Sequence, residues 1–228
     1  MLIYDAGEGS VNVRDNCLNC NGENQDIIYC NEVQKHDVYG VKDLTYRGYR
    51  PNTVIDIGAN IGTFSMMARK YWPNSNIMCF EPDQSCIPVL RSNCPSCIIQ
   101  NTAVIGYFND LKENEVIHEC TYHTNSPEAE YRNGQNKSAI SFSVLMEMIS
   151  KFFTPTDHID FLKIDCEECE VNIFREILTR GYTRHIMNIA GEWHGKAAEK
   201  QIIETFSDTH MIYIQKSDVG GIFKCQRI

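Results

Sequence analysis

The chain contains 228 residues, of which 43% are hydrophobic and 22% are charged, and its formal net charge at pH 7 is −9. This composition is typical of one globular domain with a buried core, and it excludes a mainly disordered chain. The excess of acidic residues gives no support for long-range attraction to nucleic acid or to an anionic membrane surface, so a neutral or small partner is expected.

The first 52 residues show no clear hydrophobic period, and we expect them to form a loop or a small cap. Within them, only Ile27–Tyr29 favours a strand. From residue 53 onward, short apolar runs alternate with helical patterns, which predicts a parallel sheet covered by helices on both faces. The chain is therefore interpreted as a cap, residues 1–52, and one α/β domain, residues 53–228.

The expected elements of this domain follow one another in chain order. Strands are predicted at 53–57, 76–80, 97–101, 160–164 and 185–193, and helices at 64–71, 84–93, 144–153, 171–178 and 198–206. The last two predicted strands, 211–215 and 221–226, are expected to form a closing β-hairpin. Between the third and fourth strands lies a long segment, and loops of such length are usually functional or disordered. Its polar and aromatic part, His118–Ser138, is expected to be either a lid over a substrate or a mobile surface insertion.

The stretch VIDIGANIGTFS, residues 54–65, has the pattern of a buried strand, a tight turn and the start of a helix. A dinucleotide-binding turn would require glycine where Asn60 and Thr63 stand, so that interpretation fails at two of its three glycines. Gly58 and Gly62 still allow the backbone to approach a ligand closely, because they carry no Cβ atom. Asn60 tolerates a left-handed conformation better than most residues do.

Four of the predicted strands end in an acidic residue: Asp56, Glu81, Asp165 and Glu192. Ligands of open parallel sheets bind beyond the carboxyl ends of the strands, so these acids are candidate ligand contacts. Glu81 follows Gly58 by 81 − 58 = 23 residues, about the distance at which an acid reaches ribose hydroxyls in such sheets. His194 stands at the same expected edge, and its ordinary pKa near neutrality favours a functional over a structural role.

In order and spacing, the motifs DIGANIGTFS, FEPD, FLKIDCEECE and GEWHG resemble the FkbM family of S-adenosylmethionine-dependent methyltransferases. The resemblance covers roughly residues 53–195. It implies a Rossmann-like class I methyltransferase fold, with a mostly parallel seven-stranded sheet, helices on both faces and a C-terminal β-hairpin. It also implies S-adenosylmethionine as cofactor, S-adenosylhomocysteine as product, and O-methylation of hydroxyl groups on sugars, glycans or similar small molecules.

The resemblance also implies roles for individual residues. The residues that match the family's cofactor site are Asp56, Gly58, Asn60, Gly62, Glu81 and Asp165. Apart from the resemblance, the position at the ligand-binding edge of the sheet makes His194, Asp165 and Glu192 the candidate catalytic residues. A neutral His194, or else Asp165, would accept the proton of the acceptor hydroxyl while its oxygen attacks the methyl carbon in line. Magnesium bound by Asp165, Glu167 and Glu192 is compatible with the sequence but not required by it.

One motif departs from the family pattern. In Asp165-Cys166-Glu167-Glu168-Cys169-Glu170, a glutamate occupies the position at which the family has glycine. Either the turn tolerates a side chain or its path is altered. Glu167 and Glu170 could also be ordinary acids near a helix N-terminus, where the helix dipole favours negative charge.

The chain has eleven cysteines, an odd number that cannot all pair within one chain, and free thiols are typical of a reducing compartment. The first residues show no basic region followed by an apolar run, so we expect a cytoplasmic protein. Two of the pairs Cys17/Cys20, Cys94/Cys97 and Cys166/Cys169 could converge on zinc, although small buried thiols are the commoner use of such residues.

Two rival functions use different features of the sequence. A nucleic-acid methyltransferase would share the cofactor site, but the acidic balance and the lack of a Lys/Arg stripe argue against it. A non-catalytic, zinc-bearing interaction domain would use the cysteine pairs and not the strand-end acids. The acceptor, the hydroxyl that is methylated and the oligomeric state are left open by the sequence.

Overall fold

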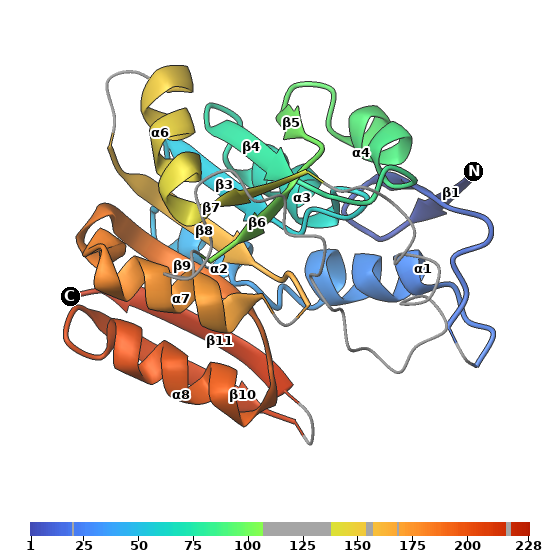
Figure 1. The fold of residues 1–228 in the computed structure, drawn as a ribbon. Helices are drawn as coiled ribbons and strands as arrows, with labels where there is room; N and C mark the ends of the chain where they lie inside the picture. Colours follow the sequence, from blue (N-terminus) through green and yellow to red (C-terminus); the bar gives the residue numbers. More distant parts are fainter. Residues whose placement is uncertain (20, 107–137, 154–156, 168, 218–219) are drawn as a thin grey trace.

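The computed structural model describes residues 1–19, 21–106, 138–153, 157–167, 169–217 and 220–228. Its centre is a seven-stranded sheet with the order β10-β11-β9-β8-β3-β4-β5 (Figure 1). The strands span Thr53–Ile57 (β3), Asn76–Phe80 (β4), Ile98–Gln100 (β5), Ile159–Ile164 (β8), Ile186–His194 (β9), His210–Lys216 (β10) and Gly220–Arg227 (β11). Only β11 runs antiparallel to its neighbours in this sheet, and it forms a hairpin with β10. The predicted class I methyltransferase fold is therefore confirmed.

Helices cover both faces of this sheet (Figure 1). They span Thr63–Tyr71 (α3), Ile87–Asn93 (α4), Phe142–Phe152 (α6), Glu170–Thr179 (α7) and Gly195–Phe206 (α8), with a 3-10 helix at Tyr182–His185. The α6, α7 and α8 helices pack on one face and α3 and α4 on the other. The predicted helix at 84–93 begins only at Ile87, and Pro88 in its first turn suits a helix start.

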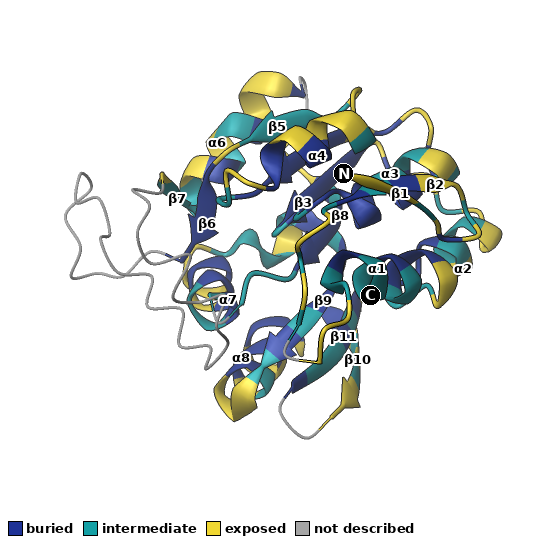
Figure 2. Ribbon diagram, turned by 90° about the vertical axis from the view of Figure 1, so that its right-hand side faces the viewer, coloured by how far each residue is buried: buried dark blue, intermediate teal, exposed yellow. Residues whose placement is uncertain are grey.

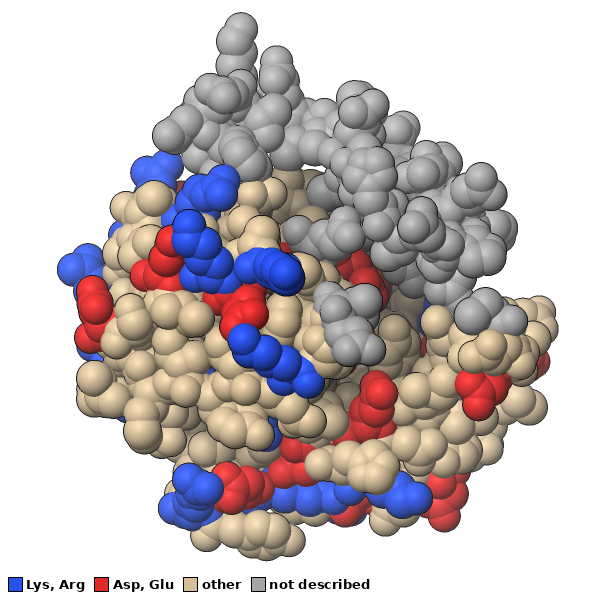
Figure 3. Space-filling view, turned by 90° about the horizontal axis from the view of Figure 1, so that it is seen from below, with Lys and Arg blue, Asp and Glu red and all other residues tan. Residues whose placement is uncertain are grey.

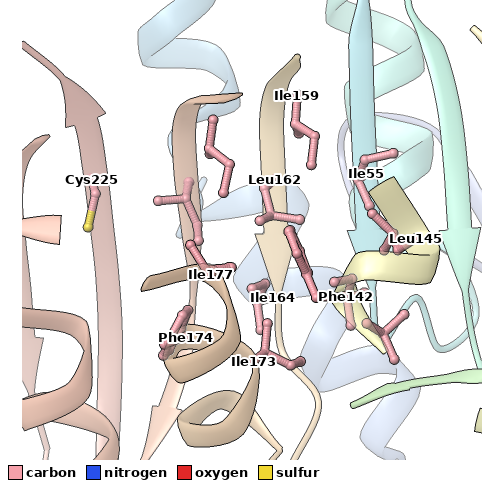
Figure 4. Packing of buried hydrophobic residues seen from close by; sticks show 14 of the residues in the cluster. Ile55, Phe142, Leu145, Ile159, Leu162, Ile164, Ile173, Phe174, Ile177 and Cys225 are labelled. Carbon is pink, nitrogen blue, oxygen red and sulfur yellow. The ribbon is translucent and has the colours of Figure 1, made fainter. Parts of the chain in front are cut away.

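Successive side chains along a strand point to opposite faces of the sheet, so an apolar core lies on each face. On β3, Ile55 and Ile57 face α6 and α7, whereas Val54 faces α3. Figure 4 shows the first of these cores, in which Phe142 and Phe174 lie over the sheet. Each fully buried side chain of this size stabilises the fold by about 1.5–3 kcal/mol, so both helical layers are held mainly by apolar burial.

The N-terminal segment is more regular than the sequence predicts. It contains a hairpin, Leu2–Asp5 (β1) with Ser10–Val13 (β2), and the helices Gln25–Cys30 (α1) and Val41–Tyr46 (α2), with a π-helical turn at Asn31–Lys35 between them. The strand expected at Ile27–Tyr29 is wrong, because these residues belong to α1. The Asn24 side chain accepts a hydrogen bond from the N–H of Ile27 and so caps that helix. Asp26 lies in the first turn, where the helix dipole stabilises a negative charge.

This segment packs against the α/β domain that follows it. Val11, Val13 and Cys30 form a small apolar cluster with Ile61 and Val89, so the hairpin and α1 lie against the turn after β3 and against α4 (Figure 2). A further parallel pair, Ala103–Ile105 (β6) and Ala139–Ser141 (β7), has no counterpart in the sequence prediction. The lid or insertion expected at His118–Ser138 lies outside the described residues except for Ser138. None of the helices in the described part of the chain has the length and apolarity needed to cross a bilayer.

Gly58 tests how tightly the turn after β3 is packed. A Cβ atom at Gly58 would lie 1.7 Å from the backbone oxygen of Asp165, and the φ of Gly58 is +75°. We expect Gly58→Ala to lower the free energy of unfolding by about 3 kcal/mol or more. Gly181→Ala is the matched control, because Gly181 has a φ of +71° and no atom within 4 Å of the added Cβ. That variant should lose only the left-handed penalty of about 1–2 kcal/mol. Urea unfolding measures both, and equal losses would contradict the packing argument.

Candidate active site

The turn after β3 is built from residues in left-handed conformation. Gly58, Asn60 and Gly62 have φ angles of +75°, +49° and +90°, so the left-handed conformation expected for Asn60 is confirmed. A Cβ atom at Gly62 would lie 2.6 Å from the Cys94 sulfur. The two glycines are therefore required by the close approach of β8 and α4, and the turn leads directly into α3.

Glu81, directly after β4, joins this turn to the next strand. One oxygen of its carboxylate accepts the N–H of Asn60 at 2.8 Å, and the other accepts the N–H of Asp83 at 2.7 Å. Glu81 is only 7% exposed, and it lines a pocket at this edge of the sheet together with Gly58 and Asp165. Because each carboxylate oxygen can accept more than one hydrogen bond, Glu81 can fix the turn and still receive hydroxyl groups of a ligand.

Asp56, a predicted cofactor contact, lies beneath the turn and does not line the pocket. Its side chain is fully buried, and it accepts a hydrogen bond from Ser65 at 2.7 Å and lies 3.3 Å from the Lys163 ammonium. Burial raises the pKa of Asp56, and the charge of Lys163 opposes that effect. Asp56 is placed to support the turn from behind, and a direct contact with a cofactor stays a prediction.

Lys163 is the main residue that the sequence analysis did not single out. It is 3% exposed, and its ammonium donates to the backbone oxygens of Gly58 at 2.6 Å and Ile57 at 3.3 Å. Burial alone would lower the pKa of Lys163, but the charges of the surrounding carboxylates outweigh it and raise that pKa. A lysine within the apolar run of β8 is the signal that could have found it, since lysine is almost never fully buried without a partner.

Two carboxyl groups stand at the open edge of the sheet. Asp165 follows β8 and Glu192 lies on β9, and the hydroxyl of Tyr39 lies 3.3 Å from the first and 3.5 Å from the second. Burial, together with the charge of Asp165, raises the pKa of Glu192 to about 8. Figure 3 shows Asp and Glu side chains around a hollow on the lower face of the molecule. A pKa of about 8 favours the protonated, neutral form of Glu192 at neutral pH.

His194 ends β9 and is held by buried Glu170. Its Nδ1 lies 3.1 Å from a Glu170 oxygen, and its Nε2 lies 3.7 Å from Glu167 and 4.0 Å from Glu192. The hydrogen bond with Glu170 is the main cause that raises the pKa of His194 to about 9. The neutral imidazole expected near pH 7 is thus not the form that these surroundings favour.

The pocket is an open cleft at the carboxyl ends of β3, β4 and β8. Among the predicted site residues, it is lined by Gly58, Asn60, Glu81 and Asp165. Glu192 and His194 line an adjoining hollow together with Glu32. The structure therefore brings all the predicted site residues to one region, with Asp56 and Gly62 behind the pocket wall.

The N-terminal segment contributes to the same pocket, which no motif predicted. Tyr29, Val33 and Tyr39 line it. Arg14, directly after β2, donates a hydrogen bond to the side-chain oxygen of Asn60 at 3.2 Å. These residues carry no sequence signal, because their role depends on contacts with residues far along the chain.

The altered acidic motif contains a strained residue. Glu167 has a φ of +52°, which is uncommon for a residue other than glycine. Glu168, which replaces the family's glycine, lies outside the described residues. Glu170 is the first residue of α7, as an acid favoured by the helix dipole would be, and it also binds His194. It is therefore more than a helix-terminal acid.

The groups of side chains that could bind a metal ion are made of acidic residues and histidines. The nine cysteines in the described part of the chain form no disulfide bond, and the groups there that could hold a metal ion contain none of them. Cys20 lies outside it. Asp165, Glu167 and His194 each place one ligand atom within 4.8 Å of the others. This set differs from the expected magnesium set, because it contains His194 in place of Glu192.

Residues 56–218 match the model of the methyltransferase FkbM domain. The chain belongs to the FkbM methyltransferase family. The match spans the turn after β3 and the strand-end acids, and the family implies that S-adenosylmethionine is the cofactor. The pocket fits this group, because the glycine turn keeps its backbone close to the pocket and Glu81 retains lone pairs for hydroxyl groups. Membership of this family favours the methyltransferase function over the zinc-bearing interaction domain.

Individual relatives are more distant. The chain is 23% identical to methyltransferase sdnD from Sordaria araneosa over 154 residues, which are 54% of this chain and 60% of that protein. The O-methyltransferase from Bacillus cereus in complex with SAH has 10% identity and a TM-score of 0.45, with 85% of this chain and 81% of that one covered. A putative rRNA methylase from Clostridium thermocellum has 6% identity and a TM-score of 0.48, with 83% and 95% covered.

The position of Glu81 predicts its effect on ligand binding. We expect Glu81→Ala to weaken S-adenosylmethionine and S-adenosylhomocysteine together by about tenfold or more, because hydrogen bonds to a charged group contribute about 1.5–3 kcal/mol. Glu81→Gln keeps one acceptor oxygen and should lose less. Titration calorimetry with both ligands gives the comparison. Unchanged binding in Glu81→Ala, or a preference of the wild type for NAD, would refute the assignment.

Proposed function

We propose that this methyltransferase transfers the methyl group of S-adenosylmethionine to a hydroxyl oxygen of a sugar, a glycan or a similar small hydroxylated molecule. The observation that supports the proposal is the group of titratable side chains at the open edge of the sheet, where Asp165, Glu192 and His194 meet from two neighbouring strands. A hydroxyl acceptor must lose its proton as it is methylated, so a base at this edge suits such an acceptor. A cytoplasmic location and a partner other than nucleic acid or membrane belong to the same proposal.

When bound, S-adenosylmethionine supplies a methyl group on a positively charged sulfur. The turn at Gly58 and the carboxylate of Glu81 hold one side of the pocket, and Asp165 lines it as well. Asp165 can accept a hydrogen bond from the acceptor hydroxyl and so orient it for in-line attack. We assign the role of base to His194, whose ring is fixed by Glu170 through Nδ1, and Asp165 is the alternative base.

His194→Ala should leave cofactor affinity nearly intact and lower turnover about a hundredfold or more, the usual contribution of a positioned base. Because the pKa of His194 is raised to about 9, most of the imidazole is protonated at pH 7. The fraction in the base form grows as pH rises through that value, so the wild-type rate should increase up to about pH 9 and then level off. The His194→Ala variant should lose this limb of the pH–rate profile.

Two outcomes would change the role assigned to His194. Near-normal turnover in His194→Ala would move the role of base to Asp165. Collapse of S-adenosylhomocysteine binding in the same variant would make His194 structural. His185→Ala is a suitable control, since His185 precedes β9 and so stands at the opposite end of that strand.

A cation-assisted form of the reaction is the second candidate. It is favoured by the convergence of Asp165, Glu167 and His194, whose ligand atoms lie within 4.8 Å of one another. An imidazole with two carboxylates suits manganese or another transition ion as well as magnesium. This form predicts that EDTA abolishes methyl transfer and that Mg²⁺ or Mn²⁺ restores it. Turnover that is unchanged by EDTA would show that the side chains act without a metal ion.

The acceptor itself can be identified by direct screening. Transfer of a labelled methyl group would be measured on a panel of glycans, free sugars and small hydroxylated molecules, with RNA and DNA as further arms. The proposed function predicts label on a hydroxyl oxygen of a panel molecule. Label on nucleic acid alone, or on a nitrogen or carbon atom, would refute it.

A further inference from the structure

Arg14 lies outside the matched family domain, yet it reaches the wall of the cofactor pocket. It directly follows β2, whose residues Val11 and Val13 are fully buried, so the backbone at Arg14 is anchored. Two of its terminal nitrogens then point at residues that line the pocket. One donates to the side-chain oxygen of Asn60 at 3.2 Å, and the other donates to the sulfur of Cys86 at 3.1 Å.

A buried carboxylate fixes the direction of this guanidinium group. Asp26, in the first turn of α1, is fully buried and accepts from Nε of Arg14 at 3.1 Å and from a terminal nitrogen at 2.7 Å. It also accepts the backbone N–H of Arg14 at 2.8 Å. A two-point contact between a guanidinium and a carboxylate sets orientation as well as position. Nε and one terminal nitrogen of Arg14 therefore hold Asp26, and that same terminal nitrogen also reaches the side-chain oxygen of Asn60 at 3.2 Å and the Cys17 sulfur at 3.1 Å. The other terminal nitrogen reaches the sulfur of Cys86.

The hydrogen bond from Arg14 would affect the bound cofactor through Asn60. It adopts a left-handed φ of +49°, and its backbone N–H is bound by Glu81 at 2.8 Å. Its side-chain oxygen accepts from both Arg14 and the thiol of Cys86. A left-handed residue other than glycine is strained by about 1 kcal/mol or more, so it needs surrounding contacts to hold it. Arg14 thus binds the side-chain oxygen of Asn60, and Glu81 binds its backbone N–H.

We propose that Arg14 is a positioning residue of the methyltransferase, which holds Asn60 and thereby keeps the cofactor turn in its binding conformation. The N-terminal segment is then part of the cofactor site. This inference rests on the binding of S-adenosylmethionine at the turn after β3, and it is independent of the acceptor. It applies equally to the product, because the turn faces both ligands.

The test is the affinity for S-adenosylhomocysteine, which needs no acceptor and no turnover. Arg14→Lys keeps a cation beside buried Asp26 but lacks the fork that reaches Asn60 as well. Asn60→Gly keeps the left-handed backbone and removes only the side chain. We expect each single variant to raise the dissociation constant about five- to tenfold. The double variant should be no weaker than Asn60→Gly by more than about twofold, because contacting residues are not additive.

A matched control separates this role from a general loss of stability. Arg69→Lys removes a comparable guanidinium, whose hydrogen bonds go to the backbone oxygens of Pro73 and Ser75 at the end of α3. That variant should bind S-adenosylhomocysteine as the wild type does, even where urea unfolding shows an equal loss of stability. Unchanged affinity in Arg14→Lys, or losses that simply add in the double variant, would overturn the role of Arg14. A wild type that binds no S-adenosylhomocysteine would instead overturn the cofactor site itself.

Discussion

The shape of the candidate site depends on one buried ammonium group. Moving a cation out of water costs several kcal/mol, so Lys163 must be surrounded by oxygen atoms. Its ammonium lies 3.3 Å from Asp56 and 3.7 Å from Asp165, and it donates to the backbone oxygen of Gly58 at 2.6 Å. These partners belong to the ends of β3 and β8, so the contact fixes the two strands at the edge where the turn begins. The turn then presents the N–H of Asn60 to Glu81.

Beyond Lys163, acidic side chains gather around Asp165, Glu192 and His194 at this edge of the sheet. These neighbours favour the protonated forms of both side chains, so the pKa of Glu192 is raised to about 8 and that of His194 to about 9. Glu32 also has a raised pKa, through burial and the charge of Asp165. At neutral pH, these pKa values favour a neutral Glu192 and a charged His194. Its chemistry is set to change between about pH 8 and pH 9.

The central strands could be predicted from the sequence because their signals are local. The bounds of β3 and β4 agree with the prediction at both ends, since each is a five-residue run that ends at a turn or at an acidic residue. The prediction failed at Ile27–Tyr29, because a three-residue apolar run does not distinguish a strand from a buried helix face. The cap supplied by Asn24 decides between them, and it depends on side-chain geometry. The packing of β1 and β2 depends on Ile61 and Val89, far along the chain.

The site shows the same division between local and long-range information. The rule that ligands bind at strand ends located the correct edge, and Glu81 and Asp165 line the pocket there. Asp56 ends its strand at the same edge, yet its side chain points beneath the turn, because Lys163 and Ser65 bind it there. A strand-end position therefore determines the region of an acidic residue but not the direction of its side chain. That direction is set by a partner on another strand, which one sequence without pairing information does not reveal.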